Sequence, residues 1–89
     1  NRNSVATVNG REISYQDFQR AYEQSVENFR QQFGGQLPPG LLEKMGIKQQ
    51  VVARLIQAEL FRQGGEEMGL VLSESAVQRE IEKMPVFQQ

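Results

Sequence analysis

The stretch KQQVVARLIQAELFRQGGEEMG, from Lys48 to Gly69, has the highest density of aliphatic residues at helical spacing in the chain. Its apolar residues recur at steps of three, four and seven, which predicts a long helix with a broad buried face. They are Val51, Val52, Leu55, Ile56, Leu60, Phe61 and Met68. Charged and amide residues interrupt the stretch well before the roughly 20 apolar residues that a membrane span needs. We expect this helix to form the centre of the fold.

Two adjacent glycines, Gly64 and Gly65, leave two interpretations of where the central helix ends. Together they cost a helix about 2 kcal/mol relative to alanine, so the helix could stop just before them. Alternatively it continues to Met68, with Gly69 as a left-handed cap and Leu70 making a hydrophobic contact beyond it. We favour the second interpretation, in which both glycines are packing residues and another backbone approaches closely at Gly65.

The composition excludes several classes of function. The 89 residues contain 10 basic and 11 acidic residues, interspersed along the chain, so no block of charge favours nucleic acid or anionic lipid. Cysteine and histidine are both absent, which removes the usual zinc ligands and the Ser-His or Cys-His nucleophile. We therefore expect no catalytic residue, no metal and no cofactor. Paired carboxylates, Glu23 with Glu27 or Glu66 with Glu67, are far more typical of solvated helix faces than of an acid-base site.

The first third of the chain predicts a β-hairpin followed by a long helix. Asn9-Gly10 is a strong hairpin signal and would join strands from Val5 to Val8 and from Arg11 to Ile13. Ser14 is placed to cap a helix that runs to Phe33. One stripe of this helix is mostly aromatic and comprises Tyr15, Phe18, Tyr22, Val26, Phe29 and Phe33. The stripe indicates core packing against the central helix. A second interpretation, compatible with the first, is that part of the stripe stays open to a partner.

The remaining segments are shorter. Glycine and proline from Gly34 to Gly40 predict a loop or hinge, and residues 41–45 can make one helical turn. Ser73 is placed to cap a last helix that runs through Met84 and stops at Pro85. The predicted fold class is mainly α, with a small N-terminal β-hairpin followed by two long helices and two short helices. We expect residues 1–89 to form a single domain.

Four segments of the chain carry a resemblance to a known family. They are Val5 to Ser14, Lys48 to Ile56, Met68 to Leu70 with Ser73, and Met84 to Gln88. In this order they resemble the N-terminal chaperone domain of bacterial periplasmic peptidyl-prolyl cis-trans isomerases, the PpiD group more closely than the SurA group. The sequence departs from the family pattern at Gly64-Gly65 and at Ser75-Ala76.

The resemblance implies a domain that binds unfolded or newly translocated envelope proteins on the periplasmic side of the bacterial inner membrane. In the PpiD group a membrane helix would precede residue 1, and catalysis belongs to a separate parvulin domain whose site includes histidines. The fragment itself should therefore not be an enzyme. We expect it to be part of a longer chain, because Val86 and Phe87 form an apolar pair with nothing left to cover them.

Two hypotheses for function follow, and an enzyme acting through carboxylates is a distant third. In the first, the domain holds client polypeptides in an apolar groove between the two long helices, bordered by Phe18, Tyr22, Phe29, Phe33, Leu55, Phe61 and Met68. In the second, it is a helical interaction or oligomerisation module without client binding. We also expect the isolated fragment to form a homodimer, in which the hinge from Gly34 to Gly40 would allow helices to exchange between copies.

Overall fold

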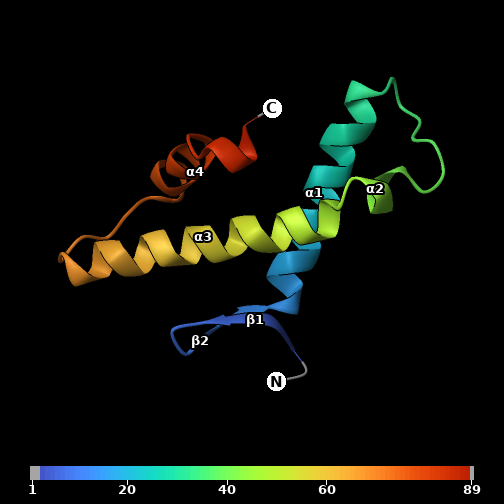
Figure 1. The fold of residues 1–89 in the computed structure, drawn as a ribbon. Helices are drawn as coiled ribbons and strands as arrows, with labels where there is room; N and C mark the ends of the chain where they lie inside the picture. The colour runs from blue at the N-terminus through green and yellow to red at the C-terminus, as the bar shows by residue number, and fades with distance from the viewer. Residues whose placement is uncertain (1–2, 89) are drawn as a thin grey trace.

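The computed structural model describes residues 3–88. A two-stranded antiparallel hairpin precedes four α-helices and a terminal 3-10 turn: β1 Ser4–Val8, β2 Arg11–Ser14, α1 Tyr15–Gln32, α2 Leu41–Lys44, α3 Ile47–Glu67, α4 Glu74–Glu82 and η1 Pro85–Phe87. In Figure 1 α3 runs across the middle, with α1 crossing its first half, α4 lying along its second half and the hairpin on the opposite side from α4. The predicted fold class is confirmed.

The hairpin turns at the predicted Asn-Gly pair. Asn9 and Gly10 have φ angles of 51° and 83°, the left-handed pair that suits a two-residue hairpin turn. Such a hairpin is marginal alone, and α3 supports it. The Nε2 of Gln63 donates to the carbonyl of Val8 at 2.9 Å, and the Nδ2 of Asn9 donates to the Oε1 of Gln63 at 2.9 Å. The hairpin is thus stabilised by α3 and not by a third strand of the described chain.

The first half of α3 packs against α1 around what we call the aromatic cluster, whose buried members are Phe18, Ile47 and Val51. Helix α1 begins as expected, since the Oγ of Ser14 accepts the backbone N–H of Asp17 at 3.0 Å. Tyr22, Phe29, Leu55 and other half-buried residues surround the buried members. This cluster joins α1 to α3.

Helix α3 continues through both glycines, which confirms the second interpretation of its end. Gly69 has a φ of 78°, and the N–H of Leu70 donates to the carbonyl of Gly65 at 2.8 Å, as a Schellman cap requires. A Cβ on Gly65 would lie 2.9 Å from the Cδ1 of Leu72, so this glycine is a packing residue. The expectation that another backbone approaches closely there is wrong, because the nearest backbone atom, the carbonyl oxygen of Leu70, would lie 3.8 Å from that Cβ. Gly64 has no such neighbour, so the expectation that it packs is wrong.

The second half of α3 packs against α4 around what we call the small-residue cluster, whose buried members are Ala58, Val77 and Ile81. The Oγ of Ser73 caps α4 by accepting the N–H of Ala76 at 3.1 Å. Helix α4 ends at Glu82, two residues earlier than expected, because the chain turns toward η1. There Phe87 packs on the cluster, which corrects the expectation of an uncovered Val86–Phe87 pair: only Val86 is strongly exposed, at 76%.

Candidate functional site

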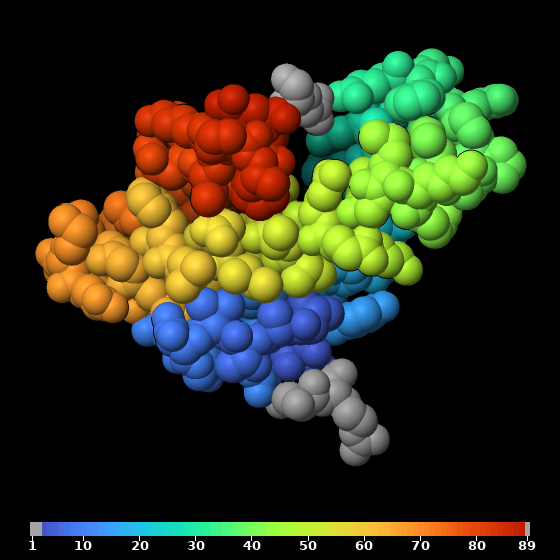
Figure 2. All heavy atoms as spheres, viewed as in Figure 1, coloured from blue at the N-terminus to red at the C-terminus, as the bar shows by residue number. Residues whose placement is uncertain are grey.

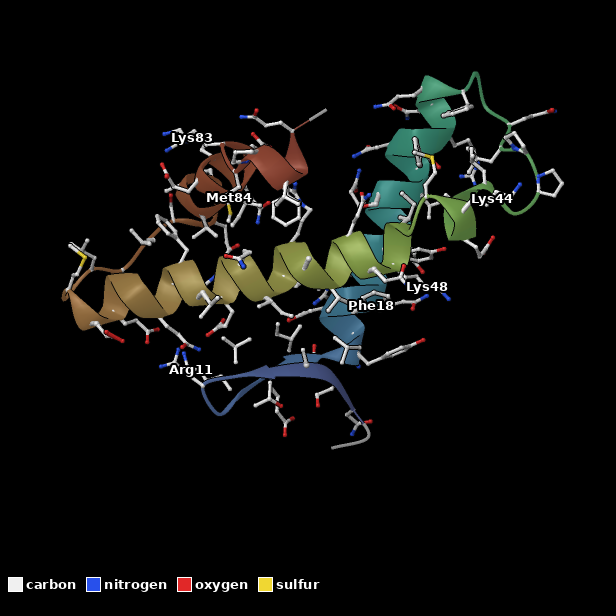
Figure 3. All side chains as sticks on the ribbon, in the orientation of Figure 1. Arg11, Phe18, Lys44, Lys48, Lys83 and Met84 are labelled. Atoms are coloured by element: carbon white, nitrogen blue, oxygen red, sulfur yellow. The ribbon has the colours of Figure 1, made fainter. Side chains whose placement is uncertain are left out.

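The predicted client-binding residues are divided between the protein interior and its surface. Phe18 is 8% exposed and stacks on Tyr22, with ring centroids 5.8 Å apart and an interplanar angle of 14°. Figure 3 shows Phe18 projecting from α1 beneath α3. Phe29 and Phe33 meet edge to face at 5.4 Å, and Phe33 is 46% exposed at the end of α1. Much of the aromatic stripe is therefore core.

The structure does not place all seven predicted residues around one groove. Phe18, Tyr22, Phe29 and Leu55 belong to the aromatic cluster, and Phe33 touches its edge through Phe29. Phe61 and Met68 lie farther along α3, Met68 roughly 20 Å from Leu55 at 1.5 Å per residue. Helix α1 crosses only the first half of α3, so the two helices diverge before they reach Met68. That these seven residues contact client polypeptides stays a prediction.

A groove of about 790 Å³ lies between α1 on one side and α4 with η1 on the other, with the first half of α3 as its floor. We call it the amide groove. Figure 2 shows the corresponding hollow between α4 and the end of α1. Of the seven predicted residues only Phe29 lines it. Met45, Val86 and Phe87 add further apolar surface, whereas Ile47 and Val51 on the floor are only 7% and 3% exposed. Its volume falls within the range of about 300–1,000 Å³ that is typical of binding pockets.

Carboxamide side chains dominate the polar lining of this groove. Six of its lining residues are amides: Gln24, Asn28, Gln32, Gln50, Gln78 and Gln88. None of these six amides was among the residues predicted to bind clients. The available signal was their spacing, because Gln24, Asn28 and Gln32 recur at steps of four and share one face of α1.

A second groove, of about 640 Å³, lies between the start of α1, the hairpin and the start of α4. Its lining is strongly charged, with four carboxylates and two guanidinium groups: Glu12, Asp17, Glu59, Glu74, Arg20 and Arg62. The Nη2 of Arg20 donates to the Oδ1 of Asp17 at 2.6 Å. Many of these charged side chains pair with one another. We therefore interpret them as structural ion pairs and not as groups that bind a ligand.

The ion pairs connect the hairpin and α4 to the same helix. Arg11 binds both carboxylate oxygens of Glu66, at 3.0 Å and 2.6 Å, and reaches from the hairpin to α3 (Figure 3). The hydrogen bonds and charge of Arg11 lower the pKa of the Glu66 carboxyl. Arg62 binds both oxygens of Glu74, each at 2.9 Å, and lowers the pKa of that carboxyl chiefly through these hydrogen bonds. Both ion pairs are exposed to solvent, so each contributes only modestly to the stability of the fold.

The described residues contain neither a candidate metal site nor a candidate membrane span. No cluster of three or more Asp, Glu, His or Cys residues that could hold a metal occurs in residues 3–88. Nor does any helix in that part of the chain combine the length and apolar character needed to cross a membrane. The amide groove combines apolar side chains with hydrogen-bonding amides, so it offers both kinds of contact to a ligand.

Fold and groove together define a small, mainly helical binding domain. The family model of the SurA-like N-terminal domain matches residues 1–89, and the chain belongs to that family. Domains of this family are chaperone-type, client-binding domains of peptidyl-prolyl isomerases and are periplasmic. Searches among curated proteins and among solved structures found no match.

Proposed function

We propose that this domain binds unfolded or newly translocated envelope proteins as the chaperone domain of a PpiD-like peptidyl-prolyl isomerase. The observation that carries the proposal is the family match over residues 1–89. The amide groove supports it, because an open groove with an apolar floor is suited to segments that a folded protein buries. In the proposed parent, residues 1–89 are one domain, a parvulin domain elsewhere carries catalysis, and a membrane helix precedes residue 1.

Binding is tested by titrating the domain with a urea-denatured outer-membrane protein diluted into buffer, followed by light scattering. We expect the domain to suppress aggregation in proportion to its concentration, because covering apolar surface removes the contacts that drive association. A natively folded protein of similar size is the control and should show no interaction. Unchanged aggregation at a large excess of the domain would refute client binding.

The same preparation should not accelerate proline isomerisation. The chain has no histidine or cysteine, so exchange in a proline test peptide should keep its uncatalysed time of tens to hundreds of seconds at 25 °C. A clear acceleration would show that this domain carries catalysis.

A second candidate function, a self-associating module, is favoured by exposed apolar residues where α3 meets α4. Val71 is 99% exposed and Met68 76% exposed, beside the partly exposed Leu70 and Phe61. A second copy could cover this surface, and the loop from Gly34 to Gly40 could let helices exchange between copies. Analytical ultracentrifugation over micromolar to high-micromolar concentration tests it: a monomer throughout would exclude this module.

A further inference from the structure

We propose that the amide groove holds client segments in an extended conformation and recognises their main chain. Carboxamides both donate to carbonyl oxygens and accept from N–H groups, so one row of them can pair with peptide groups whatever the side chains are. The inference rests on the proposed function, since it assigns that function a site and a mode of recognition. It differs from the aromatic groove predicted from sequence, because only Phe29 is common to both.

The spacing of the amides on α1 fits an extended chain. Gln24, Asn28 and Gln32 are four residues apart, which places them about 6 Å apart along the helix axis. In an extended strand the peptide groups that face one side recur every second residue, roughly 6.6 Å apart. A difference of about 0.6 Å per step is within the reach of flexible side chains. The row of amides on α1 can therefore bind consecutive members of the set of peptide groups that face one side of an extended strand.

Two of these amides already bind each other in the free domain. The Nε2 of Gln24 donates to the Oδ1 of Asn28 at 3.1 Å. This bond leaves the Oε1 of Gln24 and the Nδ2 of Asn28 to accept and donate, because no other hydrogen bond to them occurs within residues 3–88. Opposite them, Gln78 accepts from the Nη2 of Arg54 at 3.3 Å. The row on α1 thus offers both kinds of partner that a peptide group requires.

The charge of the groove favours uncharged client segments. Among residues 3–88, Arg54 and Glu82 are the only charged residues that line it, and they have opposite signs. Arg54 is already engaged, with its guanidinium 5.3 Å from the ring centroid of Phe87 as well as bonded to Gln78. In an extended segment alternate side chains point the same way, so one set would contact the floor near Phe29 while the other faces solvent. The occupant we infer is an extended, uncharged segment with apolar alternate residues, as in an unfolded envelope protein.

The test uses a matched pair of double variants on α1. Gln24→Met with Gln32→Met removes two groove amides, while Gln16→Met with Gln31→Met makes the same change at two exposed positions outside the groove. The probe is a fluorescein-labelled peptide of alternating serine and valine, measured by fluorescence anisotropy. A version with N-methyl groups on alternate amides keeps the side chains and removes N–H donors.

We expect the groove pair to weaken peptide binding about tenfold, because two hydrogen bonds to peptide groups are lost and apolar contact with methionine compensates only in part. The control pair should bind as the unchanged domain does. The N-methylated peptide should bind the unchanged domain more weakly, and the groove pair should cost it little more. Such non-additivity would identify the main chain as the group recognised.

Three results would overturn the inference. Equal or tighter peptide binding by the groove pair would show that only apolar contact matters there. A loss of self-association with unchanged peptide binding would make a second copy the occupant. Suppression of client aggregation that the groove pair does not affect would leave the proposed function standing and place its site elsewhere. If the unchanged domain binds no denatured protein at all, the proposed function fails as well, and the two failures are thereby distinguished.

Discussion

The two halves of α3 hold their partner helices by different means. In the aromatic cluster, large side chains such as Phe18 and Ile47 fill the space where α1 crosses α3. In the small-residue cluster, Ala58 and Gly65 let α4 and its connection approach α3 closely, so that Val77 and Ile81 are almost wholly buried. A helix of nine residues is docked in this way. Fewer residues pack in the small-residue cluster than in the aromatic cluster. A single substitution in the small-residue cluster should therefore destabilise α4 more than the rest of the domain.

The largest expected effect is at the centre of the small-residue cluster. Ile81→Ala should lower the free energy of unfolding by about 3 kcal/mol, because Ile81 is 2% exposed and its removal leaves a cavity. Amide hydrogen exchange should then accelerate in α4 more than in the hairpin. Val86→Ala, at an exposed position of η1, serves as control with a change within about 0.5 kcal/mol. Equal acceleration in both regions would show that the two clusters are one cooperative unit.

The adjacent glycines of α3 give a smaller, internally controlled comparison. Gly64→Ala should stabilise the domain by about 1 kcal/mol, since its Cβ meets nothing within 4 Å and alanine favours the helix. Gly65→Ala gains the same propensity but forces its Cβ against Leu72, at a cost of about 1–3 kcal/mol. Thermal or urea unfolding of the two variants should therefore separate them by that difference. Equal stabilisation would mean that Leu72 moves aside freely and the close approach is unimportant.

The smallest expected effect concerns the ion pair that fastens the start of α4. Glu74→Gln should cost about 0.5 kcal/mol at neutral pH, as for other exposed pairs. Because Arg62 lowers the pKa of Glu74 in the folded state, the stabilisation is present above the ordinary value of 4.5 and is lost as pH falls through the lowered pKa.

Urea unfolding as a function of pH measures this contribution, and the difference between Glu74→Gln and the unchanged domain should disappear at acidic pH. Glu67→Gln is the control, because Glu67 makes no ion pair within residues 3–88. A difference that persists unchanged into strong acid would show that the Arg62 pair is not its origin.

Single turn and cap residues in the sequence were sufficient to predict where the hairpin turns and where the helices begin or end. Asn9-Gly10 predicted the hairpin turn, Ser14 and Ser73 predicted the helix caps, and Gly69 predicted the end of α3. The position of Phe87 could not be predicted, because it depends on how η1 folds back over α4. Such a contact is set by tertiary packing, and no repeat in the sequence encodes it.

The candidate groove was harder to predict than the fold. An aromatic stripe signals burial, but it does not say which members the crossing helix covers, and Phe18 proved to be core. Leu55 and Met68 were predicted to border the same groove because they were assigned to one broad face of the central helix. They are far apart along that helix, so they cannot be neighbours. The amide groove also includes Gln78 and Phe87, which come from segments whose placement depends on α4 docking. Its α1 row alone was visible in the sequence.

The support of the hairpin by α3 sets an order of events during synthesis. The hairpin leaves the ribosome before the helices that follow it, yet Asn9 must wait for Gln63, 54 positions later, before the two side chains can bond. At about 5–20 residues per second this delay is roughly 3 to 11 s. Throughout it the two strands are a marginal ribbon with open edges. Among the described elements the hairpin is therefore made earliest, yet it lacks its hydrogen-bond partner on α3 until most of that helix has been synthesised.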